Sequence, residues 1–341
     1  MSRQAHFVEP MQADPPPLLE VRGLSKSFGR ERSLVQALAG RSGSLLQAVR
    51  DVSFSVNPGE VLGVVGESGC GKSTLGRCIA GLNAPSAGEM FWQGRPFAEI
   101  GDRRAASRLI QMIFQDPYSS LNPRMTVGQT IEEVLIAHGL HGGRETRAAR
   151  VDELLATVGL SPRHKERLPH AMSGGQRQRV SIARALAVEP KLIIADEPVS
   201  ALDASVQAQI INLFEELRDR LGIAFIFIAH DLNVVRHISH RVAVMYLGEV
   251  MEITQADALF EAPRHPYTKA LLSAIPWPDP DRRTTVTSLE GEPPDPLHPP
   301  VGCSFSSRCA WAQAACRAER PPLVAYDESH DVRCIRMYEI D

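Results

Sequence analysis

The sequence contains no long apolar run. Its longest such run is IAFIFIA, from Ile223 to Ala229, and a helix needs roughly 20 apolar residues to cross a bilayer. The opening residues, MSRQAHFVEPMQADPPP, also lack the apolar segment that marks a secretory signal peptide. We therefore expect a cytosolic protein, a setting in which disulfide bonds are disfavoured.

The chain also lacks an excess of charge of either sign. Its 37 Lys and Arg against 40 Asp and Glu give a formal net charge of -3, which provides no reason to expect nucleic acid as the main partner. A hydrophobic content of 43% and a charged content of 23% are ordinary for a soluble globular protein. A chain of 341 residues can bury a full hydrophobic core and can form two structural units.

Several short segments are continuously apolar and precede helical patterns. These segments are GEVLGVVG (59–66), KLIIADE (191–197) and IAFIFIAH (223–230). Such runs are typical of strands buried on both faces, and their alternation with helices predicts an α/β fold with a mostly parallel core sheet. From about residue 118 to 188 the pattern is helical, so we expect a helical subdomain there.

The ends of the chain differ from this middle part in composition. Residues 1–17 are polar and end in prolines, which predicts a disordered tail. The 30–48 stretch is predicted to be a surface loop. Eight prolines between residues 276 and 300 predict an extended linker. We therefore expect a main domain over residues 18–275, followed by the linker and a module over residues 301–341.

A phosphate-binding motif follows the first of the buried strands. GESGCGKST matches G-x-x-x-x-G-K-[ST], in which glycines let backbone N–H groups point at a phosphate chain and the next helix directs its positive end to it. We expect Lys72 to reach the β- and γ-phosphates and the Ser73 hydroxyl to ligate Mg²⁺. The predicted nucleotide-binding residues in this loop are Gly66, Glu67, Ser68, Gly69, Cys70, Gly71, Lys72, Ser73 and Thr74.

Two further segments indicate phosphate chemistry only weakly when each is taken alone. In LIIADE, Asp196 could hold Mg²⁺ and Glu197 could polarise an attacking water, but acidic residues also follow buried strands without any function. SGGQRQR opens a helix at Ser173, and an uncovered helix N-terminus can bind an anion. From the residues alone, an ordinary capped helix is the favoured interpretation of this second segment.

Taken together and in order, the motifs resemble the nucleotide-binding subunits of ABC transporters. GESGCGKST, IQMIFQDP, SGGQ, LIIADE, SALD and FIAH follow one another within residues 18–275. QDPYSSLNPRMTVG, HPYTKALLSAIP and PPDPLHPPVGCSFSSRC make the chain most similar to the ATP-binding subunits of oligopeptide/dipeptide importers. SLNPRMTVG resembles the F-type subunit more than its D-type partner. The resemblance implies a P-loop NTPase fold of the ABC type and ATP hydrolysis.

The resemblance also implies roles for individual residues in a head-to-tail pair of ATPases that encloses two ATP molecules. Glu197 would be the general base, and Gln115 and His230 would lie at the Mg²⁺ and the γ-phosphate. Phe28 would stack on the adenine, although a core phenylalanine at the end of a strand is the alternative. The implied Mg²⁺ ligands are Ser73, Gln115 and Asp196. The residues implied to meet the ATP of the partner subunit are Ser173, Gly174, Gly175, Gln176 and Asp203.

The same resemblance implies the partners and the place of work of the protein. It would pair with a second, paralogous D-type ATPase, serve two membrane-spanning permease subunits and an external peptide-binding protein, and lie at the cytoplasmic face of the cell membrane. The implied function is ATP-driven import of dipeptides or oligopeptides, with nickel chelates and glutathione as open alternatives for the cargo. A soluble ABC ATPase of DNA repair or translation is the other alternative, but the chain has one cassette and no heptad run.

Four of the six cysteines lie close to the end of the chain with the spacing C-x5-C-x6-C-x17-C. Structural zinc sites usually contain C-x2-4-C pairs, which these gaps do not match. Four thiolates suit an iron–sulfur cluster, and some importer ATPases with this pattern are understood to bind one. The resemblance therefore implies a [4Fe–4S] cluster, with zinc and unligated thiols as the alternatives. The implied ligands are Cys303, Cys309, Cys316 and Cys334.

Overall fold

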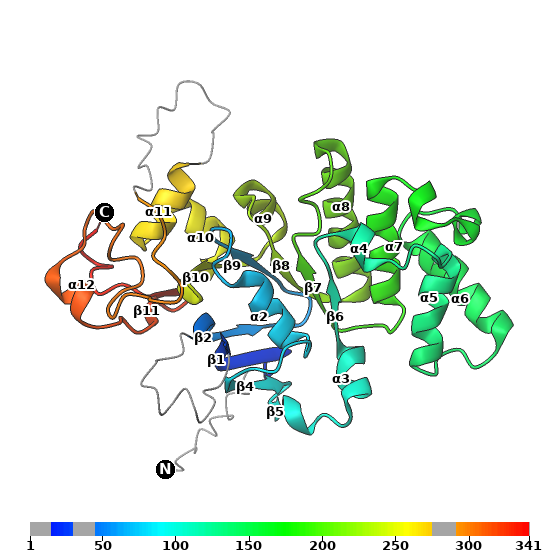
Figure 1. Cartoon of the computed structure of the whole chain (residues 1–341), viewed down its shortest axis with the longest axis horizontal. Coiled ribbons are helices and arrows are strands. Elements are labelled where there is room, and N and C mark those ends of the chain that lie inside the picture. Colours follow the sequence, from blue (N-terminus) through cyan, green and yellow to red (C-terminus); the bar gives the residue numbers. More distant parts are fainter. Residues whose placement is uncertain (1–14, 30–44, 275–290, 341) are drawn as a thin grey trace, which may run out of the picture.

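The computed structural model describes residues 15–29, 45–274 and 291–340. An eight-stranded sheet forms its centre, in the order β11-β12-β10-β9-β3-β8-β7-β6 (Figure 1). The five strands from β9 to β6 run parallel, so the predicted α/β fold with a mostly parallel core sheet is confirmed. These five strands are β3 (Val61–Val65), β6 (Ile110–Ile113), β7 (Leu192–Asp196), β8 (Ala224–Ile228) and β9 (Arg241–Tyr246).

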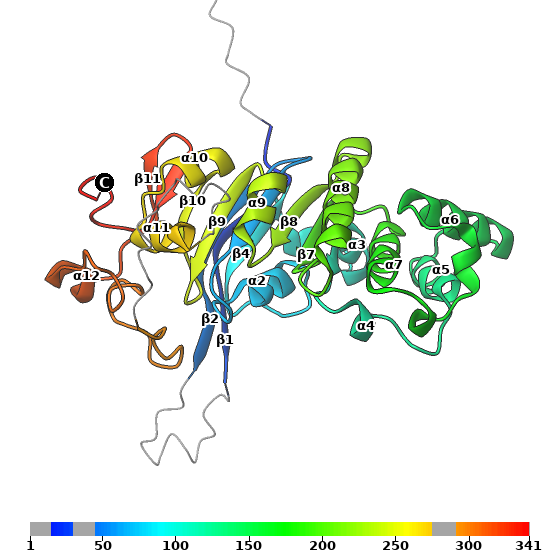
Figure 2. The ribbon, with the colours of Figure 1, turned by 90° about the horizontal axis from the view of Figure 1, so that it is seen from above.

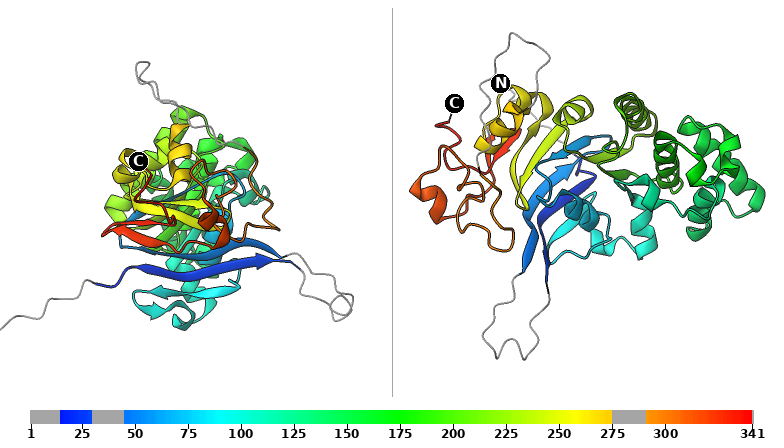
Figure 3. Two further views of the ribbon diagram at one scale, coloured as in Figure 1. Left: turned by 90° about the vertical axis from the view of Figure 1, so that its left-hand side faces the viewer. Right: turned by 45° about the horizontal axis from the view of Figure 1, so that its top comes forward.

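A second, antiparallel sheet has the order β2-β1-β4-β5. Figure 3 shows its long strands β1 and β2, drawn in blue, along one face of the main sheet. Its strands are β1 (Leu19–Phe28), β2 (Leu46–Val56), β4 (Ala87–Trp92) and β5 (Arg95–Pro96). The helix that follows the P-loop, α2 (Lys72–Ile79), packs between the two sheets, since its Leu75, Cys78 and Ile79 are buried in one cluster with residues of both.

The continuously apolar strands are explained by burial on both faces. Side chains in β3 alternate between two hydrophobic clusters, since Leu62 and Val64 pack with the antiparallel sheet while Val61 and Val65 pack with helices on the other face. All five residues of β3 are buried. Because neither face meets water, a polar residue is excluded at every position and the usual period-2 alternation is lost.

Helices make up the stretch from residue 117 to residue 186, all of which the structure describes. Figure 2 shows α5 and α6 as the part of this stretch that lies furthest from the main sheet. This region corresponds to the helical subdomain predicted for residues 118–188. Its helices are α4 (Pro117–Ser120), α5 (Val127–Ala137), α6 (Arg144–Thr157), the 3-10 helices η2 (Pro162–Glu166) and η3 (Pro169–Ala171), and α7 (Gly174–Leu186).

The remaining helices cover the two faces and the ends of the main sheet (Figures 1 and 2). None of the helices in the described ranges combines the length and the apolar character that crossing a membrane requires. These helices are α2 (Lys72–Ile79), η1 (Phe97–Glu99), α3 (Arg103–Leu109), α8 (Ala204–Leu221), α9 (Leu232–Ile238), α10 (Ala256–Glu261), α11 (Pro266–Ser273) and α12 (Ala314–Ala318).

The C-terminal residues extend the main sheet. Strand β10 (Glu249–Gln255) pairs with β12 (His330–Val332), and β12 pairs with β11 (Val324–Asp327), in both cases antiparallel. Residues 301–340 therefore pack directly on the ABC domain, although their assignment as a separate module stays a prediction. The predicted N-terminal tail, the 30–48 loop and the proline-rich linker fall mostly or partly outside the described residues.

Candidate functional site

A cavity of about 470 Å³ opens at the edge of the main sheet where the parallel strands end. Residues from eight separate places in the sequence line it, and most of them belong to the predicted motifs. The predicted residues that line it are Phe28, Ser68, Gly69, Gly71, Lys72, Ser73, Thr74, Gln115, Glu197 and His230. Gly66, Glu67 and Cys70 belong to the same loop but do not line the cavity.

The P-loop connects β3 to α2 and depends on glycine for its path. Gly71 has a φ of 107°, and a Cβ at this position would lie 2.1 Å from the carbonyl oxygen of Ala48 in β2. Only glycine tolerates both the left-handed backbone and this contact. Helix α2 begins directly after Gly71, so its free N–H groups lie at the cavity, where they can bind phosphate oxygens.

Lys72 is held along the inner side of the P-loop. Its Nζ donates to the carbonyl oxygens of Gly66 at 2.8 Å and Glu67 at 3.0 Å, and the residue is only 5% exposed. The ammonium group is therefore oriented by the loop that it serves, as a phosphate-binding lysine requires. Cys70 is buried beside this lysine, with its Sγ 3.8 Å from the Lys72 Nζ, and burial raises the pKa of its thiol.

A hydroxyl and a carboxylate lie together at the end of β7. The Oγ of Ser73 donates to Oδ1 of Asp196 at 2.7 Å. Asp196 is 2% exposed, and burial raises the pKa of its carboxyl group. Hard oxygen donors of this kind, kept in place by packing, are the ligands that Mg²⁺ prefers.

Three side chains from three neighbouring strand ends meet at Glu197. The Nε2 of Gln115 donates to Oε2 of Glu197 at 2.8 Å, and Nδ1 of His230 lies 3.5 Å from the same oxygen. Glu197 has a φ of 47°, and its N–H donates to the carbonyl oxygen of Ile228 in β8. Because β6, β7 and β8 are adjacent and parallel, their carboxyl ends bring these residues to one edge of the sheet.

The residues of SGGQ lie away from this cavity, at the start of α7. Ser173 and Gln176 form a capping box, in which the Ser173 Oγ accepts from the Gln176 N–H and the Gln176 Oε1 accepts from the Ser173 N–H. A Cβ on Gly175 would lie 2.4 Å from Cγ1 of Val206 in α8. Gly175 is therefore needed for packing, because the absence of a side chain allows α7 and α8 to approach closely.

Asp203 caps the neighbouring helix α8. Its Oδ1 accepts from the Val206 N–H at 3.0 Å and from the Ser205 hydroxyl at 2.7 Å, and the hydrogen bond from Ser205 lowers the pKa of the Asp203 carboxyl group. Gly174 lies close to the same turn, since a Cβ on it would lie 3.2 Å from Cδ2 of Leu202. The four SGGQ residues and Asp203 thus occupy the starts of two adjacent helices.

Phe28 lies at the mouth of the cavity and is 39% exposed. The Nζ of Lys26 lies 5.0 Å from the centre of its ring. The exposed face of an aromatic ring at the mouth of a cavity can stack on a nucleobase. This exposure excludes the alternative of a phenylalanine buried in the core. The assignment to adenine stays a prediction.

The four C-terminal cysteines line one small cavity of about 20 Å³. Apolar and aromatic residues, among them Phe305 and Trp311, complete its walls. Burial raises the pKa of the Cys303 thiol to about 12 and also raises those of Cys309 and Cys334. In the part of the chain that the structure describes, no three His, Cys, Asp or Glu side chains are placed to hold a metal ion, so the predicted metal site receives no support from this arrangement.

Some residues that line the larger cavity escaped the sequence prediction. They are Leu46, Gln47, Ala48, Leu247, Gly248 and Pro296. The Gly248 N–H donates to the carbonyl oxygen of Cys70 at 2.8 Å, so the turn between β9 and β10 supports the P-loop. A glycine in a turn is the only sequence signal here, and it does not indicate which loop the turn contacts.

The comparison with protein families supports the same reading of the chain. Residues 49–200 match the model described as ABC transporter, and residues 251–316 match the oligopeptide/dipeptide transporter C-terminal region. A probable peptide ABC transporter ATP-binding protein of Sinorhizobium fredii is 51% identical over 93% of this chain and 89% of its own length. The oligopeptide transport ATP-binding protein OppF of Haemophilus influenzae is 48% identical over 94% of this chain and 97% of its own.

This chain belongs to the ATP-binding proteins of peptide ABC transporters. The solved structures agree on the fold of this ABC protein. A dimeric ATP-binding cassette, MJ0796, in a post-hydrolysis state with ADP and Pi has a TM-score of 0.59 at 30% identity and covers 70% of this chain and 98% of its own. CbiO1 of Clostridium perfringens, part of the transporter complex cbiONQ, has a TM-score of 0.60 at 28% identity and covers 72% of this chain and 92% of its own. The predicted family, fold and ATPase class are confirmed.

Proposed function

We propose that this chain hydrolyses ATP to power the import of dipeptides or oligopeptides across the cytoplasmic membrane. The observation that carries the proposal is the convergence of Glu197, Gln115 and His230 beside the P-loop cavity. A match to the oligopeptide/dipeptide transporter C-terminal region supports the cargo, as do the names of relatives such as OppF.

In the proposed reaction, Glu197 acts as the general base that orients and deprotonates the attacking water. Gln115 and His230 fix its Oε2 from two sides, which leaves Oε1 to accept the hydrogen bond from that water. Lys72 and the first N–H groups of α2 hold the phosphates, so catalysis comes from positioning and charge stabilisation. Ser73, Asp196 and Gln115 would hold Mg²⁺, which neutralises charge on the β- and γ-phosphates when it is bound.

A second ATPase subunit would complete each site. Ser173, Gly174, Gly175 and Gln176 lie at the start of α7, outside the cavity of their own chain, and Ser173 is exposed there. We propose that they contact ATP held by the partner, with Asp203 at the same interface. We propose that the chain is an F-type subunit whose partner is a D-type paralogue. The pair would serve two permease subunits and an external peptide-binding protein from the cytoplasmic face of the membrane, without nucleic acid.

We also propose that the four C-terminal cysteines hold a [4Fe–4S] cluster. The support is chemical, because four thiols from separate parts of residues 303–334 line one cavity with largely apolar walls, and four thiols are the donor set of such a cluster. The spacing of these cysteines contains no C-x2-4-C pair, which is the usual zinc pattern, and this favours iron–sulfur over zinc.

Reconstitution with its membrane subunits tests the transport proposal. The full chain, its permease subunits and the peptide-binding protein in vesicles should hydrolyse ATP faster when di- or oligopeptide is added, and should accumulate labelled peptide inside. Stimulation by a nickel chelate or by glutathione, but not by peptides, would show that this solute is the cargo in place of peptides. ATPase activity that responds to nucleic acid and to none of these solutes would favour a soluble ABC ATPase of DNA repair or translation.

A further inference from the structure

The C-terminal residues contact the P-loop directly, at a residue that the nucleotide-binding motif leaves unspecified. Nη1 of Arg308 donates to both carboxylate oxygens of Glu67, at 2.9 and 3.0 Å. The arginine side chain is 6% exposed and the glutamate side chain is 24% exposed, so water screens this ion pair much less than a surface pair. Arg308 lies in the short segment between Cys303 and Cys309.

The backbone of Glu67 is held by a second element. Its N–H donates to the hydroxyl oxygen of Tyr267 at 3.0 Å, and Tyr267 belongs to α11 and is fully buried. Its carbonyl oxygen accepts from the ammonium group of Lys72 at 3.0 Å. Any displacement of Glu67 therefore moves an acceptor of the phosphate-binding lysine.

Aromatic rings join Arg308 and Tyr267, the two residues that hold Glu67, into one packed cluster. The ring centres of Tyr246 and Tyr267 lie 4.7 Å apart, and Phe305 lies 5.4 Å from the first and 5.3 Å from the second. All three residues are at most 2% exposed. Arg308 also donates to the hydroxyl oxygen of Tyr246 at 3.3 Å. Rings packed in this way have few alternative rotamers, so they hold the tyrosine hydroxyls and the guanidinium group in place.

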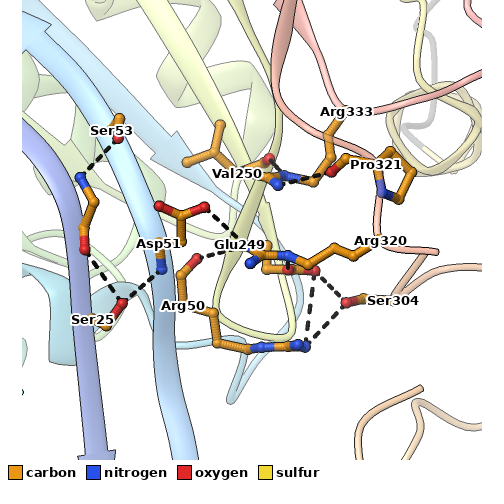
Figure 4. Close-up of polar contacts among 11 residues, drawn as sticks. Ser25, Arg50, Asp51, Ser53, Glu249, Val250, Ser304, Arg320, Pro321 and Arg333 are labelled. Atoms are coloured by element: carbon orange, nitrogen blue, oxygen red, sulfur yellow. Dashed lines mark hydrogen bonds and ion pairs between the residues drawn. The ribbon is translucent and has the colours of Figure 1, made fainter. Parts of the chain in front are cut away.

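A buried carboxylate anchors the same segment to the main sheet from another side. Figure 4 shows Glu249 of β10 between Arg320 and Arg50, with Ser304 beside it. Glu249 is fully buried, pairs with Arg320 and accepts from the Ser304 hydroxyl. Ser304 directly precedes Phe305, so a buried charge pair and the aromatic cluster fix neighbouring residues. The segment that carries Arg308 is therefore docked on both sides, as a positioning role requires.

We propose that Arg308 and Tyr267 are positioning residues of the ATP site, through which the C-terminal segment sets the affinity for ATP. The carboxylate of Glu67 lies in the loop that receives a strongly anionic phosphate chain, and like charges repel. Arg308 neutralises that carboxylate and turns it away from the cavity, while Tyr267 holds the backbone from which Lys72 is oriented. The ATP site thus extends to residues that neither touch the cavity nor belong to a nucleotide-binding motif.

Equilibrium titration of the full chain with the fluorescent analogue mant-ATP and Mg²⁺ tests this inference. Arg308→Met should raise the dissociation constant about tenfold, because the Glu67 carboxylate then faces the phosphates without its cation. Arg308→Lys should retain most of the affinity. Glu67→Gln in the Arg308→Met background should restore binding to within about threefold of the wild type, since a neutral amide needs no cation. Tyr267→Phe, which keeps the ring and removes the hydroxyl, should also weaken binding.

The matched control is Arg317→Gln, which removes an exposed arginine of α12 and should leave the dissociation constant unchanged. Urea unfolding of each variant identifies any chain that fails to fold. The rescue by Glu67→Gln then decides whether the weaker binding of Arg308→Met comes from the unpaired charge of Glu67 or from damage to the fold. Binding by Arg308→Met within twofold of the wild type would overturn the inference, as would a double variant that binds as weakly as Arg308→Met alone. The inference rests on ATP binding by the P-loop and not on the cargo, so a wild-type chain that fails to bind mant-ATP would instead overturn the proposed function.

Discussion

Gln115 and Glu197 are joined by a hydrogen bond of 2.8 Å from the amide Nε2 to the carboxylate Oε2. The two residues follow adjacent parallel strands, β6 and β7, and are 82 positions apart in the sequence. His230, after the next strand, approaches the same oxygen. One carboxylate oxygen is thus held from two sides, and the other oxygen can accept a hydrogen bond from water.

This arrangement predicts the effect of removing the proposed general base. Glu197→Gln should lower ATP hydrolysis at least about 100-fold, the scale expected for the loss of a general base, because an amide cannot take the proton of the attacking water. Phosphate release by the assembled transporter measures it, with the partner site silenced by its own substitution. Binding of mant-ATP should persist. Hydrolysis close to the wild-type rate would contradict the role of Glu197.

The hydrogen bond between Ser73 and Asp196 predicts a change in the Mg²⁺ requirement. Ser73→Ala removes the hydroxyl that donates to Asp196 at 2.7 Å and that is expected to ligate the ion. The Mg²⁺ concentration for half-maximal ATP hydrolysis should rise about tenfold or more, the factor that corresponds to about 1.4 kcal/mol. Ser73→Thr keeps a hydroxyl and should stay close to the wild type. Equal Mg²⁺ curves for both variants would count against the assignment.

The close approach of α7 and α8 predicts unequal effects for two adjacent glycines. Gly175→Ala places a Cβ 2.4 Å from Cγ1 of Val206, so the free energy of unfolding should fall by about 1–3 kcal/mol through overpacking. Gly174→Ala meets only the flexible end of Leu202 at 3.2 Å and should cost less. Urea unfolding measures both. Val206→Ala should recover part of the loss in Gly175→Ala, and the absence of recovery would show that this contact is not the cause.

The four cysteines on one cavity predict a brown protein with iron and sulfide when it is purified without oxygen. Absorbance near 400 nm and about four iron atoms per chain are the expected readings for a [4Fe–4S] cluster. Cys309→Ser should lower the iron content, while Cys78→Ser, at a buried cysteine of α2, should leave it unchanged. Stoichiometric zinc without iron, or no metal at all, would contradict the proposed cluster.

Local patterns determined much of the fold in advance. The strands over 61–65, 192–196 and 224–228 follow from runs that have no polar residue facing water, and the start of α7 follows from the capping serine in SGGQ. The P-loop was readable because its glycines and lysine act within nine consecutive residues. These features depend on interactions between near neighbours in the chain, which spacing records directly.

The sequence by itself determined the α/β class, the P-loop and, through its ordered motifs, the ABC family. Only the tertiary structure decided that Gln115, Glu197 and His230 share one oxygen, because this depends on the order of β6, β7 and β8 in the sheet. It also decided that Arg308 pairs with Glu67 across 241 positions. No spacing rule links such residues, since their contact depends on how β9, α11 and the C-terminal segment pack together and not on any local preference of the chain.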